Sequence, residues 1–166
     1  MEIIRALPSD AETLTQIAFA AKRHWNYPEQ WIEQWRTELT ITAPYIETHE
    51  VYAARVEGEL VGFYSLAGDA DKIELDNLWV LPRTMGQGIG RALFAHAVER
   101  ARARGAPQLV IESDPNAEGF YRRMGAQRIG EKIRVTEGQR REIPVLIFDL
   151  HTASESKHED EQNARS

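Results

Sequence analysis

A glycine-rich segment, residues 86–91 with the sequence GQGIGR, has residue types and spacing that could do chemistry. It lies between an apolar run that ends at Pro82 and a pattern of apolar residues typical of a helix. Small residues at such a junction let backbone N–H groups converge at the positive end of a helix, which favours the binding of an anion such as phosphate. A tight strand-to-helix turn without any ligand would need the same glycines.

The spacing of the glycines argues against two common nucleotide-binding motifs. A P-loop needs the sequence Gly-Lys-Ser/Thr, which is missing. A dinucleotide fingerprint needs its third glycine three positions after the second, whereas Gly86, Gly88 and Gly90 follow at intervals of two. Glu112 lies about where a ribose-binding acid would be expected, and it is the one feature shared with that fingerprint. A nucleotide-binding module is therefore the more distant interpretation.

The run from Leu78 to Leu93 resembles the coenzyme A-binding segment of the GCN5-related N-acetyltransferases, the GNAT family. The family's pattern of Arg or Gln, two residues, Gly, one residue, and Gly or Ala falls on Met85, Gly88 and Gly90, so that Met85 replaces the Arg or Gln. The resemblance implies that acetyl-coenzyme A is the co-substrate and that backbone amides and the helix dipole hold its phosphates. The coenzyme A-binding residues that it implies here are Leu78, Trp79, Val80, Met85, Gly86, Gln87, Gly88, Ile89, Gly90, Arg91 and Ala92.

A second segment, residues 114–126 with the sequence DPNAEGFYRRMGA, resembles the family's Asn-containing turn and the Phe-Tyr pair after it. In many members the asparagine lies six residues before the phenylalanine, where this chain has Asp114, while Asn116 lies four residues before Phe120. Either Asp114 or Asn116 is therefore expected to contact coenzyme A, together with Phe120 and Tyr121.

Acetyl transfer to an amine needs a base, a donor to the oxyanion and an acid for the leaving thiolate. The resemblance implies Glu74 as the base, the backbone N–H of Leu78 as the oxyanion donor and Tyr121 as the acid, with Val80 pairing to the pantetheine arm. Asp76 shares a strand face with Glu74, and either Asp76 or a water relay could act as the base instead of Glu74. The competing interpretations are that both carboxylates line a solvated strand and that Tyr121 is a core residue.

Aromatic residues near the N-terminus indicate where an acceptor could bind. Trp25 and Tyr27 precede Trp31 and Trp35, in the region that in this family overhangs the acceptor site. We expect Trp25, Tyr27 and Asp76 to bind the acceptor, although Trp31 and Trp35, four residues apart, would also suit core packing. The five histidines do not pair with carboxylates at helix-face spacing, so no metal is expected.

Apolar periodicity predicts the elements that position these residues. A helix after Pro8 carries Leu14 and Ile17, and a second helix is expected from about Pro28. Strands are predicted at 3–4, 51–56, 60–66, 73–81, 109–111, 127–135 and 143–150, and helices from the glycine turn to Gly105 and at 115–124. The order βααβββαβαββ, with the resemblance, predicts an α/β (α+β) fold with a mixed, mostly antiparallel sheet of six to seven strands and helices on both faces.

Length and composition bound the domain organisation and the partners. The chain has 166 residues, enough for one domain at 1–150, and its tail at 151–166 lacks large apolar side chains and is expected to be disordered. A net charge of −6 argues against nucleic acid, and no apolar run suits a membrane span. Without cysteine, thiol chemistry and disulfides are excluded, and the N-terminus lacks a signal-peptide pattern, which favours the cytoplasm.

Taken together, these patterns predict an N-acetyltransferase that moves an acetyl group from acetyl-coenzyme A to a primary amine in a ternary complex. A small molecule, peptide or protein could supply the amine. The alternative is a non-catalytic acyl-coenzyme A sensor on the same fold. Exposed C-terminal strands would allow a homodimer.

Overall fold

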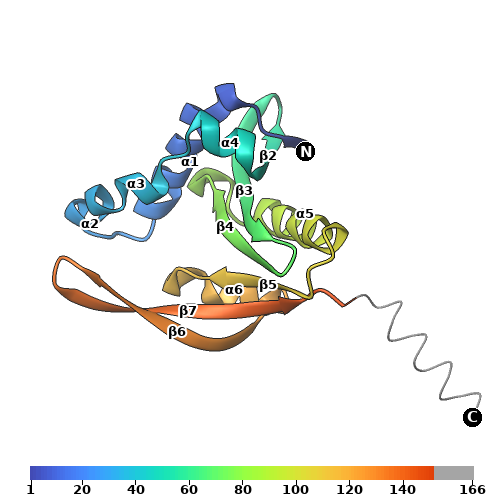
Figure 1. Ribbon diagram of the computed structural model, residues 1–166. Coiled ribbons are helices and arrows are strands. Elements are labelled where there is room, and N and C mark those ends of the chain that lie inside the picture. The colour runs from blue at the N-terminus through green and yellow to red at the C-terminus, as the bar shows by residue number, and fades with distance from the viewer. Residues whose placement is uncertain (152–166) are drawn as a thin grey trace, which may run out of the picture.

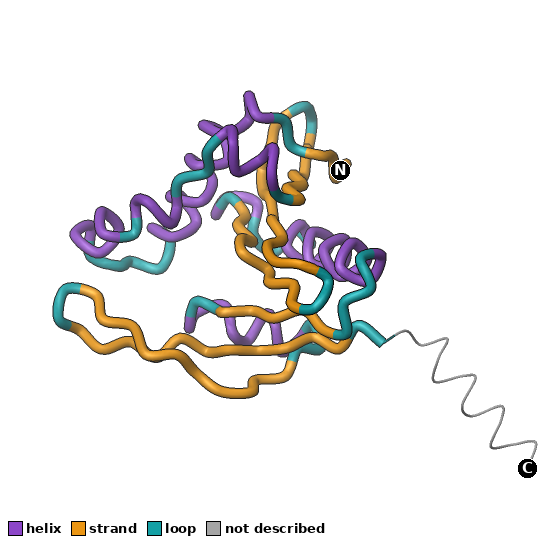
Figure 2. Tube along the Cα trace, viewed as in Figure 1, coloured by secondary structure: helices purple, strands orange, loops and turns teal. Residues whose placement is uncertain are grey.

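The structure is a computed structural model that describes residues 1–151. Within this range seven strands form one sheet in the order β1-β2-β3-β4-β5-β7-β6, with helices on both faces (Figures 1 and 2). Neighbouring strands are antiparallel except β4 and β5, which are parallel. The mixed, mostly antiparallel sheet predicted from the sequence is thus confirmed. The strands are β1 (Glu2–Arg5), β2 (Glu50–Val56), β3 (Glu59–Asp69), β4 (Lys72–Val80), β5 (Gln108–Glu112), β6 (Gln127–Thr136) and β7 (Gln139–Asp149).

The helices agree with the prediction except between β1 and β2. They are α1 (Ala11–Arg23), α2 (Glu29–Gln34), α3 (Arg36–Leu39), α4 (Ala43–Thr48), α5 (Ile89–Ala103) and α6 (Glu118–Arg123). The single helix expected from Pro28 is therefore three short ones. The chain leaves the helical conformation at Thr40, which is extended, and Thr42 then caps α4 by accepting a hydrogen bond from the N–H of Tyr45.

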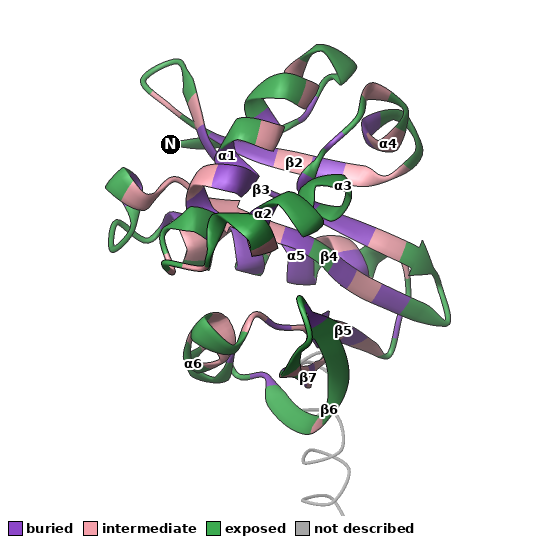
Figure 3. Cartoon of the chain, turned by 90° about the vertical axis from the view of Figure 1, so that its left-hand side faces the viewer, coloured by how far each residue is buried: buried purple, intermediate pink, exposed green. Residues whose placement is uncertain are grey.

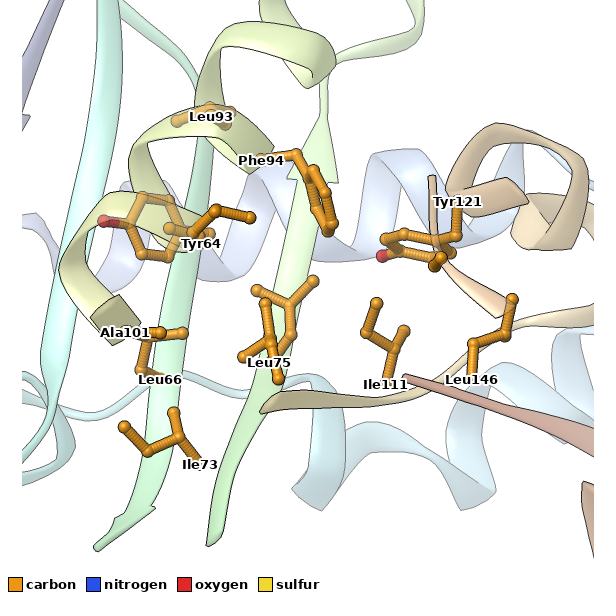
Figure 4. Close-up of a cluster of buried hydrophobic side chains, with 14 of the residues drawn as sticks. Tyr64, Leu66, Ile73, Leu75, Leu93, Phe94, Ala101, Ile111, Tyr121 and Leu146 are labelled. Carbon is orange, nitrogen blue, oxygen red and sulfur yellow. The ribbon is translucent and has the colours of Figure 1, made fainter. Parts of the chain in front are cut away.

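The sheet separates two hydrophobic clusters. On one face, Leu93 and Phe94 of α5 belong to one cluster with Ile73 and Leu75 of β4, and Figure 4 shows the ring of Phe94 directed toward Leu75. On the other face, α1 to α4 cover Phe63 and neighbouring residues of β2 and β3. Each layer buries apolar side chains that alternate along the strands, which is the main source of stability for such a sandwich.

The hairpin of β6 and β7 forms the far edge of the sheet, and most of β6 is exposed (Figure 3). Its turn reaches toward α2 (Figure 1), where the amide of Gln34 donates a hydrogen bond of 2.6 Å to Glu137. No helix within residues 1–151 combines the length and the apolar character needed to cross a bilayer. The predicted tail lies outside the described residues except for His151, and the single domain at 1–150 stays a prediction.

Candidate active site

The glycine turn enters α5 through two left-handed backbone conformations. Gly86 has a φ of +81° and Gly88, the N-cap of α5, has a φ of +82°. A Cβ atom at either position would meet nothing within 4 Å, so backbone conformation, and not crowding, favours glycine here. The N–H of Ala92 donates to the carbonyl of Gly88 at 3.0 Å, which leaves the N–H groups of the preceding turn available to an anion. Met85 is 38% exposed beside them.

Strands β4 and β5 pair over only a short length and then diverge. Their register comprises Ile73 with Leu109 and Glu74 with Val110, so within the described residues the later part of β4 has no strand partner on that side. The N–H of Leu81 donates to Val61 of β3 at 2.8 Å. Because peptide groups alternate in direction along a strand, those of Leu78 and Val80 face the open side. The predicted roles of Leu78 as the oxyanion donor and of Val80 as the partner of the pantetheine arm both require this outward orientation. The orientation alone does not test them.

A β-bulge changes which face of β4 each side chain occupies. Ser65 of β3 pairs with Asn77 and Leu66 pairs with Leu75, so Asp76 is the extra residue. Before the bulge, odd-numbered residues such as Leu75 pack toward α5, and after it Leu78 and Val80 do so. Consecutive residues Asp76 and Asn77 therefore share the face that α1 to α4 cover.

The bulge brings Asn77 into a chain of hydrogen bonds that ends at Asp76. The hydroxyl of Tyr45 donates to Asp76 and lies 2.8 Å from Ser65 Oγ. Asn77 Nδ2 donates to the same Ser65 Oγ at 2.9 Å, and Trp79 Nε1 donates to Asn77 Oδ1 at 2.9 Å. Since Tyr45 gives its proton to the carboxylate, every donor in the chain points toward Asp76, and such an arrangement is mutually reinforcing. Burial, helped by this bond to Asp76, raises the pKa of Tyr45.

Sequence reasoning missed Tyr45, Ser65 and Asn77. They come from three different elements, α4, β3 and β4, and no motif joins them. Only the bulge places Asn77 on the same face as Asp76. A regular strand would have turned Asn77 toward α5, so alternation in the sequence gave no signal for this group.

Glu74, the predicted base, lies one step before the strands diverge. It is the last residue of β4 that pairs with β5, and its carboxylate is 3.4 Å from Lys72 Nζ. Its side chain is 38% exposed. Glu74 and Asp76 both border the cleft described below.

Tyr121 lies in the core beside the divergent strands. Its ring centroid is 5.8 Å from that of Phe94 and 5.2 Å from that of Phe120, and Figure 4 shows it extending from α6 toward Phe94 and Ile111. Burial raises the pKa of Tyr121, so the phenol keeps its proton throughout the neutral range. A proton donor needs this property, and a core tyrosine would share it.

Asp114, one of the two predicted coenzyme A contacts, is bound by groups of this chain. Its carboxylate accepts hydrogen bonds from Lys22 Nζ at 2.6 Å, the hydroxyl of Tyr27 at 3.0 Å and the backbone N–H of Asn116 at 2.9 Å. Burial would raise the pKa of Asp114, but Lys22 and these donors outweigh it and hold that pKa below its usual value. Asn116 is exposed, and its side-chain amide donates to Tyr27 and Asp114. Whether either residue touches coenzyme A stays a prediction.

The aromatic residues predicted near the acceptor gather around two cations. Tyr27, Trp31 and Trp35 contact one another with ring centroids 5.0 to 6.0 Å apart. The guanidinium of Arg141 lies within 5.8 Å of all three ring centroids, and Lys22 Nζ lies 4.3 Å from that of Trp35. We call Tyr27, Trp31 and Trp35 the aromatic cluster.

Of the two residues predicted to bind the acceptor from this region, Tyr27 belongs to the aromatic cluster, although it is not among the residues that border the cleft described below. Burial, together with Asp114, raises the pKa of Tyr27 to about 12. Trp25 instead packs edge-on against His24 and is not among the residues that border the cleft. Its role as an acceptor contact stays a prediction.

A cleft of about 700 Å³ joins the divergent strands to the aromatic cluster, a volume usual for a small-molecule site. Its walls come from α1 to α3, β4, the end of β5 and the β6–β7 hairpin. The charged residues that line it are Lys22, Glu38, Glu74, Asp76, Glu112, Asp114, Arg134 and Arg141. Three are basic and five are acidic, so the lining carries more negative than positive groups.

Comparisons with known proteins agree with this geometry. The model of the acetyltransferase (GNAT) family matches residues 13–126. Streptothricin acetyltransferase of Streptomyces lavendulae is 33% identical over 111 residues, which cover 64% of this chain and 52% of that protein. A peptidyl-lysine N-acetyltransferase of Salmonella typhimurium is 38% identical over 74 residues, which cover 45% of this chain and 47% of that protein. The chain thus spans about half the length of these curated relatives.

Solved structures with the same fold include two acetyltransferases. A GCN5-related N-acetyltransferase from Rhodopseudomonas palustris superposes with a TM-score of 0.76 at 24% identity, over 89% of this chain and 94% of that one. The PaiA N-acetyltransferase from Thermoplasma acidophilum, in complex with coenzyme A, gives 0.70 at 22% identity, over 89% and 98% of the two chains. At these identities the likeness shows the fold alone.

Proposed function

Because this chain belongs to the GNAT acetyltransferase family, we propose that it transfers the acetyl group of acetyl-coenzyme A directly to a primary amine bound in the cleft. One observation carries the proposal. The open edge of β4, with the peptide groups of Leu78 and Val80 directed outward, lies between the glycine turn and the charged cleft. A thioester held along that edge would meet an amine from the cleft.

The glycine turn fits the phosphates of coenzyme A. Gly86 and Gly88 adopt conformations that leave the space around their α-carbons open. The N-terminus of α5, a helix of 15 residues, adds a positive end. Residues 86–91 would therefore hold the phosphates largely through their backbone, and the exposed Met85 would contribute little to that contact.

The chemistry assigns one role to each group around the open edge. The amine nitrogen attacks the thioester carbon, a C–N bond forms and the C–S bond breaks. A carboxylate of β4 takes the amine proton, the N–H of Leu78 donates to the oxyanion, and Tyr121 gives its proton to the thiolate and recovers one from solvent. Asp76 has more structural support as the base than Glu74, because the hydroxyl of Tyr45 holds its carboxylate at the cleft, whereas the carboxylate of Glu74 faces Lys72.

The test is thiol release from acetyl-coenzyme A in the presence of a panel of amines, with mass spectrometry of the products. We expect turnover with at least one amine. Asp76→Asn should reduce kcat by about 100-fold, and Glu74→Gln, its matched partner on the same strand face, by much less. A reversal of these two effects would restore Glu74 as the base. Absence of thiol release with every amine, from a protein that binds coenzyme A, would contradict the transferase proposal.

That last outcome would favour the second candidate, a non-catalytic acyl-coenzyme A sensor. The observation behind it is Met85, an exposed apolar side chain at the position where the family pattern has Arg or Gln. A sensor would bind acetyl-coenzyme A tightly, and Tyr121→Phe would leave that binding unchanged.

A further inference from the structure

The three cations that line the cleft differ in how they are neutralised. Lys22 forms an ion pair with Asp114 at 2.6 Å, and Arg134 forms one with Glu112 at 3.1 Å. Within residues 1–151, Arg141 has no carboxylate at ion-pair distance, and the one hydrogen bond of its side chain goes to the hydroxyl of Tyr27 at 3.1 Å. A guanidinium has five N–H donors, so most of those of Arg141 are left for another partner.

Packing holds Arg141 in place for such a partner. Its guanidinium lies 5.1 Å from the ring centroid of Tyr27, 5.8 Å from that of Trp31 and 4.7 Å from that of Trp35. Contact with aromatic faces restricts the motion of a guanidinium while its N–H groups can still form hydrogen bonds. A planar fork of donors fits a carboxylate through two parallel hydrogen bonds.

The acidic groups of the cleft come from other elements. Asp76 and Glu74 project from β4, whereas Arg141 belongs to β7 and Lys22 to α1. Glu38 of α3 also lines the cleft and forms no ion pair within the described residues. Glu74 and Asp76 thus form an acidic wall at the strand where acetyl transfer would occur, and Lys22 and Arg141 lie at the aromatic cluster, where Asp114 and Glu38 act on Lys22.

We propose that the acceptor carries a carboxylate as well as its amine, as an amino acid or a short peptide does, and that Arg141 binds this carboxylate. The acceptor amine then faces Asp76 and Glu74 at the open edge of β4. This inference rests on the proposed acetyltransferase function, and it names the substrate class of the same cleft.

Matched acceptors test the inference in the enzyme. Free amino acids are compared with their carboxamides, which keep the amine and lose the carboxylate, and kcat/KM is measured by thiol release. Since hydrogen bonds to charged groups contribute about 1.5–3 kcal/mol, the acids should be preferred by roughly 10- to 100-fold. Arg141→Gln should remove most of that preference through a higher KM. Arg140→Gln, a change at the exposed neighbouring residue on β7, should keep it.

A binding measurement separates this inference from the proposed function. N-acetyl amino acids and N-acetyl amino acid amides are titrated into the coenzyme A-saturated protein, and tryptophan fluorescence is followed because Trp31 and Trp35 lie beside Arg141. Wild-type protein should bind the acids and not the amides, and Arg141→Gln should bind neither. This result without turnover of any amine would sustain the carboxylate subsite and overturn the transferase function. Turnover of acids and amides at equal rates, or an unchanged preference in a folded Arg141→Gln, would overturn the subsite alone.

Discussion

The two sides of this site, which we propose bind the acetyl donor and the acceptor and call the donor side and the acceptor side, are built in opposite ways. The donor side comes from one continuous stretch, β4, the glycine turn and α5, and it presents mainly backbone groups. The acceptor side is assembled from side chains far apart in sequence: Lys22 meets Asp114 across 92 positions, and Arg141 meets Tyr27 across 114. The two sides meet where β4 and β5 diverge.

This difference explains why the two sides respond differently to sequence change. A backbone cradle depends on glycine conformations and on strand divergence, so many side chains around it could vary. The stability of a cleft lined by ion-paired side chains depends on each partner, because a buried charge without its counter-charge is unfavourable. We therefore expect substitutions on the acceptor side to act through stability and acceptor KM, and those on the donor side to act through coenzyme A binding and kcat.

The largest effect is expected from Asp114→Asn. This change leaves the buried ammonium of Lys22 without its counter-charge, where the two side chains are only 11% and 8% exposed. Breaking such a pair should lower the free energy of unfolding by about 3–4 kcal/mol, measured by urea titration. Asp71→Asn, at an exposed turn, is the matched control. If the variant instead loses coenzyme A affinity at full stability, Asp114 belongs to the donor side.

The same variant should change how stability depends on pH. The pKa of Asp114 is held below its usual value in the fold, so its stabilisation is present above about pH 4 and is lost as the pH falls through the lower folded value. Wild-type protein should therefore lose stability on acidification more steeply than Asp114→Asn.

Burial lowers the pKa of Lys22 in the folded protein, so wild-type stability should also rise as the pH increases toward 10.5.

Tyr121→Phe should produce the next largest effect, and it tests the donor side. Loss of the acid should lower kcat by about 100-fold, or about 2.7 kcal/mol, with little change in the KM for acetyl-coenzyme A. Because burial raises the pKa of Tyr121, ionisation of this phenol should not limit the wild-type rate below about pH 10. Tyr52→Phe, on the same face of the sheet, is the control. A decrease of less than about threefold would assign Tyr121 to the core alone.

The order of the elements and the glycine turn could be predicted because each is a local pattern. The strands and long helices follow from apolar periodicity, and residues 86–91 carry their spacing within six positions. The sequence predicts a second helix from about Pro28 but not its division, because Trp31, Trp35 and Leu39 keep helical spacing across the break. Its division reflects capping by Thr42 and the extended Thr40, which are weaker signals than periodicity.

The acceptor side could be predicted only in part. Tyr27 and Asp76 were identified by residue type and position, but Arg141 and Lys22 resemble ordinary surface cations in the sequence. The pairing of β7 with β5 and the packing of α1 bring them together, and neither is visible in local spacing. Tyr45 depends in addition on a bulge, which adds one residue to β4 without any glycine or proline to mark it.

A pair of glycines two residues apart should give smaller effects of opposite sign. Gly88→Ala forces a side chain into a left-handed conformation and should cost about 1–2 kcal/mol of stability, together with weaker coenzyme A binding. Gly90 has an ordinary φ, and a Cβ there would lie 3.6 Å from Phe120, an ordinary contact. Gly90→Ala should therefore stabilise α5 by about 0.5–1 kcal/mol. Thermal unfolding measures the stability of both variants, and titration calorimetry measures their affinity for coenzyme A. If Gly88→Ala changes only the KM for the acceptor, the donor-side role of this glycine is contradicted.

The smallest effect is expected from Tyr45→Phe, which tests whether Asp76 links the two sides. The variant loses the donor to Asp76 and the contact with Ser65, and a net hydrogen bond contributes about 1 kcal/mol to stability. If Tyr45 positions the base, Tyr45→Phe should lower kcat/KM for the amine several-fold when Asp76 is present. In protein that already carries Asp76→Asn it should change kcat/KM hardly at all, because the carboxylate to be positioned is missing. A double-mutant cycle measures this coupling. Additive losses would mean that Tyr45 only stacks on His49, and that the acidic wall of the cleft functions without the bulge-dependent chain of hydrogen bonds.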